Sequence, residues 1–152
     1  MLQRSQTLFL LWVFILSQFL LLGPITRFTL EGSEFVLKHS GLFDAAGEKM
    51  EVATWPLSVL FIAVAVLALL NIFLFKHRML QMRIVVFLIL LNAGMVLMMF
   101  YYTFVAKSKL EGALVLHQWR FVVPPISMIL LYFAFRRIRR DELLVKAFDR
   151  IR

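Results

Sequence analysis

Cysteine is absent from this chain of 152 residues. Its absence excludes disulfide bonds, thiolate metal sites, CxxC redox pairs and a cysteine nucleophile. The sequence also lacks an HExxH motif, a glycine-rich phosphate loop, a GxSxG elbow and the protein-kinase signatures. Charge is scarce as well, at 17% of residues. We therefore expect no metal and no cofactor, and no familiar catalytic motif supports an enzyme.

Apolar residues, in contrast, make up 62% of the chain, against roughly 45–50% in a typical soluble domain. A single domain of this size could not bury so much apolar surface, so the composition predicts an integral membrane protein. Four apolar stretches contain no Asp, Glu, Lys, Arg or His. They are Thr7–Leu22, Trp55–Phe75, Ile84–Val105 and Phe121–Phe135.

A bilayer core needs about 20 helical residues, which the second and third stretches supply. The first and fourth reach that length only with weakly polar flanks. Because lipid offers no hydrogen bonds to the backbone, we expect helices throughout. The predicted fold is an all-α membrane protein, an up-down bundle of four transmembrane helices in one domain. Its spans are 7–23, 55–75, 84–105 and 119–135.

The first stretch has an alternative interpretation as a secretory signal peptide, with Arg4 in its basic region. The exit at Leu22–Ile25 has no small-x-small cleavage pattern, so a retained helix is favoured.

The charges predict the orientation. Segments 1–6, 76–83 and 136–152 hold eleven Lys and Arg residues against three acids, whereas the rest of the chain holds six of each. By the positive-inside rule, both termini face the cytoplasm. The whole net charge of +8 lies on that face, which favours anionic lipid headgroups and disfavours nucleic acid as the partner.

The sequence pattern of the outer loop, 24–54, predicts β structure. Arg27–Leu30 and Glu34–Lys38 flank turn residues and predict a hairpin. We interpret Ser40–Asp44 as a turn, Lys49–Thr54 as a possible third strand and Ala113–Leu116 as another. These would form a small extracytoplasmic cap resting on the helix ends, loosely like the topology of claudins.

The cytoplasmic tail, 136–152, has the pattern of an amphipathic helix. Its apolar residues are Leu143, Leu144, Ala147, Phe148 and Ile151, which share one helical face. The favoured interpretation is an extension of the fourth helix or a helix on the membrane surface. The alternative is a docking helix for a cytosolic protein.

Three segments carry a family resemblance: Met1–Thr7, Phe73–Gln81 and Arg139–Arg152. With all four apolar stretches, they resemble a family of small four-helix bacterial inner-membrane proteins catalogued only as a domain of unknown function. The resemblance implies an integral membrane location and four spans. The resemblance implies no particular activity, substrate or catalytic residue for this chain.

Two groups of polar residues are candidate sites. A cytoplasmic cluster comprises Arg4, Lys76, Arg78, Gln81, Arg139, Arg140, Asp141, Glu142, Asp149 and Arg150. We expect Arg4 or Arg78 to donate to Asp141 or Asp149, although simple headgroup contacts would explain the same residues. The intramembrane group comprises Gln18, Asn71, Asn92 and Ser127. We interpret it as interhelical packing, with a hydrogen bond between Asn92 and Ser127 possible.

The absence of ionisable residues inside the spans favours a non-enzymatic structural, scaffolding or accessory subunit. Its protein partner would contact the cap, the tail or a helix face. The alternatives are a small transporter or channel for a neutral or lipidic solute, bordered by the intramembrane group, and a lipid-active enzyme with a pocket beside Lys76–Arg83.

Overall fold

The computed structural model describes residues 5–44, 46–50 and 52–149. These form four α-helices: α1 (Ser5–Leu21), α2 (Trp55–Phe73), α3 (Arg78–Lys109) and α4 (Val123–Asp149). Five strands accompany them: β1 (Thr26–Leu30), β2 (Ser33–Lys38), β3 (Gly41–Phe43), β4 (Lys49–Met50) and β5 (Leu114–His117). Two short 3-10 helices, η1 (Leu74–Lys76) and η2 (Trp119–Val122), precede α3 and α4.

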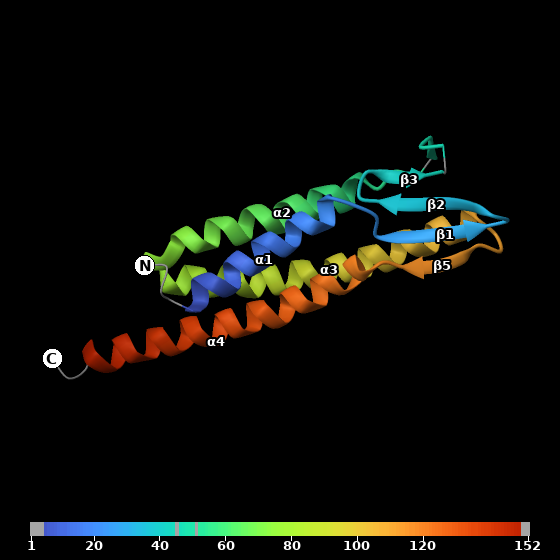
Figure 1. Ribbon diagram of the computed structural model, residues 1–152. Coiled ribbons are helices and arrows are strands. Elements are labelled where there is room, and N and C mark those ends of the chain that lie inside the picture. The colour runs from blue at the N-terminus through green and yellow to red at the C-terminus, as the bar shows by residue number, and fades with distance from the viewer. Residues whose placement is uncertain (1–4, 45, 51, 150–152) are drawn as a thin grey trace.

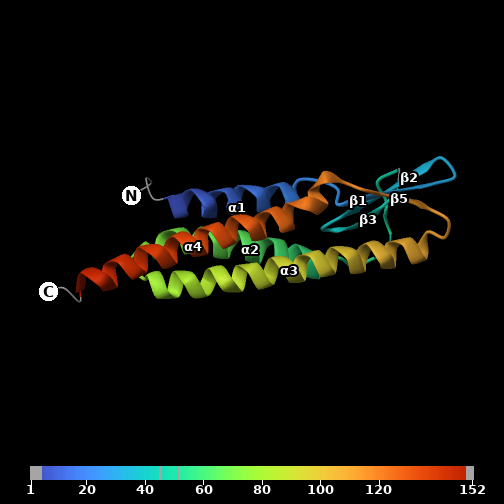
Figure 2. The same ribbon diagram turned by 90° about the horizontal axis from the view of Figure 1, so that it is seen from below.

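The four helices form an elongated up-down bundle (Figure 1). α1 packs against α2 and α4, and α3 packs against the same two helices, so the four close into a ring. The sheet lies at one end, which we call the sheet end. η1, the start of α1, the start of α3 and the last turns of α4 lie at the other, which we call the hinge end (Figure 2).

Three of these helices are long and apolar enough to cross a membrane: Trp55–Phe73, Arg78–Lys109 and Trp119–Leu144. Thr7–Leu21 is a shorter apolar helix. Two prolines, Pro124 and Pro125, lie in the first turn of α4, where a missing backbone N–H leaves no bond unmade. The fold is thus mostly helical, with a small sheet.

The helices extend beyond the predicted spans. Residues 76–83 were expected to connect two helices, but α3 begins at Arg78, which leaves Leu74–His77 as the hinge. Residues 136–149 continue α4 without a break, so the tail is an extension of the fourth helix. At the other end, α1 stops at Leu21, short of the predicted limit of 23.

The sheet has the order β4-β3-β2-β1-β5, and every pairing is antiparallel. The predicted hairpin is confirmed as β1 and β2, with Leu30 opposite Ser33. Its two-residue turn has positive φ at Glu31 (48°) and Gly32 (83°), which is the type I′ geometry that matches strand twist. The strand predicted at Ala113–Leu116 is confirmed as β5, one residue later, and it joins β1.

The turn predicted at Ser40–Asp44 is wrong, because Gly41–Phe43 forms β3. The chain turns earlier, at His39 and Ser40. Leu42 is fully buried, and this apolar burial favours continuing the sheet over an exposed turn. Of the possible strand Lys49–Thr54, Lys49–Met50 pairs as β4, and 52–54 are not in a strand.

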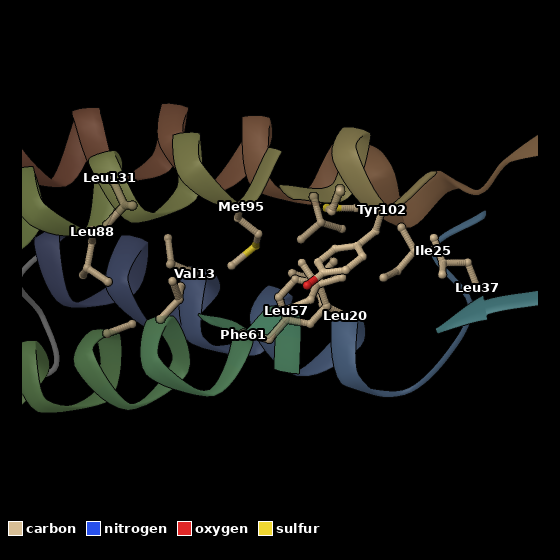
Figure 3. Close-up of a cluster of buried hydrophobic side chains, with 14 of the residues drawn as sticks. Val13, Leu20, Ile25, Leu37, Leu57, Phe61, Leu88, Met95, Tyr102 and Leu131 are labelled. Carbon is tan, nitrogen blue, oxygen red and sulfur yellow. The ribbon is translucent and has the colours of Figure 1, made fainter. Parts of the chain in front are cut away.

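One continuous apolar core runs from the bundle into the sheet. Figure 3 shows Val13, Leu88, Met95 and Leu131 directed between the helices, with Ile25 and Leu37 near the sheet. Small buried residues, among them Ala65, Ala68, Ala106 and Ala134, let the helices approach closely. The outer surface is apolar too, since Leu97 and Phe104 are more than 70% exposed. Such a helix surface is typical of lipid contact.

Candidate functional site

The described members of the predicted cytoplasmic cluster lie at the hinge end. The expected contact between Arg78 and Asp141 is present there, but with a different acceptor atom. Arg78 Nη1 donates to the main-chain carbonyl of Asp141 at 2.9 Å, instead of to its carboxylate. This bond joins the first turn of α3 to α4. Arg4 and Arg150 lie outside the described residues, as do the side chains of Lys76 and Asp149.

The remaining cluster members do not converge on one site. Arg139 and Arg140 are exposed on α4, and Asp141 and Glu142 beside them are half-buried. Gln81 points the other way, into the bundle, and is 1% exposed. The cluster is therefore a basic surface with one amide that belongs to the interior.

Gln81 meets Asn71, which the sequence analysis placed in the intramembrane group. Gln81 Nε2 donates to the main-chain carbonyl of Asn71 at 3.1 Å. Three atoms at this point are buried without a partner: Asn71 Nδ2, Asn71 Oδ1 and Gln81 Oε1. A buried polar atom left unpaired costs about 1–3 kcal/mol. The hinge between α2 and α3 thus holds an unsatisfied polar pair.

The other intramembrane residues are packed separately. Asn92 Nδ2 donates to the Leu88 carbonyl in its own helix at 2.8 Å. Ser127 is buried on α4, and no bond between it and Asn92 occurs in the described part of the chain. Gln18 is half-buried on α1. None of these four residues lines either of the two grooves at the hinge end.

Two grooves flank α4 at the hinge end. The first, between α3 and α4, has a volume of about 480 Å³. Its lining is Met79, Met82, Arg83, Val86, Phe135, Arg139, Glu142 and Leu143. The lining includes one acid, Glu142, and two bases, Arg83 and Arg139, and the other lining residues are apolar. It occupies the region beside Lys76–Arg83 where the sequence analysis would place the pocket of a lipid-active enzyme.

The second groove, between α1 and α4, has a volume of about 750 Å³. Its lining is Phe9, Phe133, Arg136, Arg137, Arg139, Arg140 and Leu143. Four arginines lie beside aromatic and aliphatic side chains, and the lining residues that the structure describes include no acid. The chemistry suits an anion that also carries an apolar part.

At the sheet end, Arg120 has a role that the sequence analysis missed. Its Nε donates to the Phe19 carbonyl at 3.0 Å, and its Nη1 lies 3.5 Å from the Pro24 carbonyl. A cation there complements the negative end of the α1 dipole. A Cβ at Gly23 would come within 2.6 Å of the guanidinium, so glycine leaves the room that Arg120 occupies.

His39 joins the sheet to the start of α2. Its carbonyl accepts hydrogen bonds from the hydroxyls of Thr54 and Ser58, both at 2.7 Å. Its Nδ1 is buried without a partner. Burial, and to a lesser degree the nearby charge of Lys38, lower the pKa of His39 below its ordinary value of 6.5. Both effects favour the neutral form of the imidazole.

Comparison with known proteins identifies the family. The family model described as domain of unknown function DUF4293 matches residues 2–151. The chain belongs to the DUF4293 family. Among curated proteins, none matches it closely enough to count as a relative. The resemblance to a family of unknown function is thus confirmed over nearly the whole chain. Membership in DUF4293 transfers no catalytic or binding residue to these grooves.

Proposed function

We propose that this DUF4293 protein is a non-enzymatic integral membrane protein, a structural or accessory subunit of a bacterial inner membrane. All four helices would span the bilayer, and the sheet would form an extracytoplasmic cap, a likeness to claudins in topology alone. A protein partner would contact the cap or the C-terminal part of α4. Three long apolar helices and an apolar outer surface support the membrane location.

In the orientation that we propose, the hinge end faces the cytoplasm. Arg78, Arg83 and the four arginines of residues 136–140 gather at this end, and the segments of the sheet end carry equal numbers of acids and bases. The positive-inside rule supports the same orientation.

The observation that carries the proposal of an accessory subunit over a transporter is the way most intramembrane polar groups are packed, with Asn71 the exception. Ser17 and Asn92 bond to carbonyls of their own helices, and Thr103 does the same. Such bonds satisfy polar groups without a water-filled space. Neither groove described above is lined by Gln18, Asn71, Asn92 or Ser127. This packing disfavours the alternative of a small transporter or channel for a neutral or lipidic solute.

The lack of cysteine allows a direct test of the orientation. Single substitutions Ala46→Cys at the sheet end and His77→Cys at the hinge end introduce the sole thiol at exposed positions. In intact cells, a membrane-impermeant maleimide should label Ala46→Cys alone, and permeabilisation should expose His77→Cys. The reverse pattern would invert the topology, and labelling of both in intact cells would overturn the four-span proposal.

The accessory role is tested by extraction in mild detergent, crosslinking and reconstitution. We expect the chain to migrate in a complex larger than its own micelle, and liposomes that contain it to remain tight to small neutral solutes. Recovery of the monomer alone, together with solute flux above that of empty liposomes, would overturn the proposal in favour of the transporter.

A further inference from the structure

The groove between α1 and α4 concentrates positive charge on a short piece of one helix. Arg136, Arg137, Arg139 and Arg140 lie within five consecutive residues, and all four are exposed. None of them pairs with a carboxylate in the part of the chain that the structure describes. Like charges three or four residues apart destabilise a helix, so this segment gains from an external anion.

Aromatic side chains form the other half of the groove. Phe9 of α1 and Phe133 of α4 lie with their ring centroids 6.0 Å apart. Both belong to apolar stretches without charged residues, and the arginines begin directly after the stretch that ends at Phe135. The groove therefore changes from apolar to cationic within about one turn of α4.

We propose that this groove is a binding site for an anionic phospholipid. The guanidinium groups of Arg136 and Arg140 would hold the phosphate by paired, charge-assisted hydrogen bonds, and an acyl chain would lie along Phe9 and Phe133. Four cations without an acid favour a lipid with two phosphates, such as cardiolipin, over one with a single phosphate. The inference rests on the proposed membrane location, and deepens it by naming a lipid class.

The groove between α3 and α4 differs from the proposed lipid site in the charge of its lining residues. There, Glu142 lies among the lining residues with Arg83, so a carboxylate would repel an incoming anion. The two grooves nevertheless share Arg139 and Leu143. In the groove between α1 and α4, none of the lining residues within the described part of the chain is an acid. Arg83 is thus a matched control residue: basic, exposed and at the same end of the bundle.

The test measures lipid binding to the full chain purified in detergent, by native mass spectrometry and by the shift in thermal unfolding temperature. Wild-type protein should bind cardiolipin more tightly than phosphatidylglycerol, and phosphatidylcholine least. The variant Arg136→Gln/Arg140→Gln should weaken cardiolipin binding about 25-fold, since each arginine near a lipid surface contributes about fivefold. The control Arg83→Gln/Lys107→Gln removes the same charge and should keep wild-type affinity.

Three outcomes would overturn the proposal. Equal losses in the two double variants would mean that net charge alone attracts the lipid. Full competition by inorganic phosphate would mean a site for a soluble anion. Retained affinity in Arg136→Gln/Arg140→Gln, with an unchanged circular dichroism spectrum, would place the lipid elsewhere. Because binding is measured in detergent, its failure is independent of the cysteine-labelling result for the membrane orientation.

Discussion

The two ends of the bundle satisfy their polar groups in opposite ways. At the sheet end, Arg120 binds the carbonyl of Phe19. Thr26 Oγ1 lies 3.2 Å from Thr103 Oγ1, which itself donates to the Met99 carbonyl, so Thr26 is the donor between β1 and α3. At the hinge end, Asn71 and Gln81 keep unpaired atoms.

Apart from His39 Nδ1, which is also buried without a partner, the sheet end is thus a finished end and the hinge end an incomplete one. Hydrogen bonds and a five-stranded sheet tie the sheet end to α1, α2 and α3 within the chain itself. The hinge end has one cross-helix arginine bond, from Arg78, and a row of arginines that lack an acid within the described residues. Partners from outside the chain, such as water or lipid, would complete it.

The largest loss of stability should come from Phe28→Ala, which removes a buried side chain from the core at the sheet end. Phe28 is fully buried on β1, the strand between β2 and β5. Removing a buried phenyl ring costs about 3–5 kcal/mol through lost burial and a cavity. Thermal unfolding of the chain in detergent, followed by circular dichroism, measures this loss. Phe104→Ala, at an exposed position on α3, is the control and should change stability by less than about 0.5 kcal/mol. Equal losses would mean that the sheet does not depend on this core.

A smaller loss should follow from Arg120→Met, which removes the donor from the end of α1. Hydrogen bonds to a charged group contribute about 1.5–3 kcal/mol, and we expect a loss in that range. Gly23→Ala should act through the same contact, because its Cβ displaces the guanidinium. The two changes should therefore be less than additive in a double-mutant cycle.

The control for Arg120→Met is Arg27→Met, which breaks an exposed ion pair with Glu34 at 3.8 Å. Such pairs contribute about 0–1 kcal/mol. Full additivity of Gly23→Ala and Arg120→Met would contradict the coupling between the glycine and the guanidinium.

Local patterns predicted much of this fold, and distant contacts explain what they missed. The hairpin at Glu31 and Gly32 and the apolar helices are encoded within a few residues. Arg120 was counted as a loop charge because its acceptor, Phe19, lies 101 residues away. The meeting of Asn71 and Gln81 depends on the hinge, whose conformation no local pattern specified. β3 was missed because three residues carry too little pattern to separate a strand from a turn.

At the incomplete end, removal of a polar group should stabilise the protein. Asn71→Leu removes two unpaired buried atoms while keeping a similar volume, so we expect a gain of about 1 kcal/mol in the free energy of unfolding. Asn92→Leu is the matched control, since Asn92 is equally buried but already bonded to Leu88, and it should gain less. A loss in Asn71→Leu would mean that a bound water or ligand satisfies Asn71.

The smallest effect should be the contribution of His39, at the sheet end, to the pH dependence of the protein's stability. Because the pKa of His39 in the fold is below 6.5, the unfolded chain binds this proton more readily. Stability from the neutral imidazole is therefore present above pH 6.5 and is lost as the pH falls through the lowered pKa. Unfolding temperatures measured across this range should fall more steeply in wild type than in His39→Gln. His77→Gln, at an exposed position, is the control and should keep the wild-type slope. An unchanged slope in His39→Gln would show that burial of His39 does not couple protonation to the sheet.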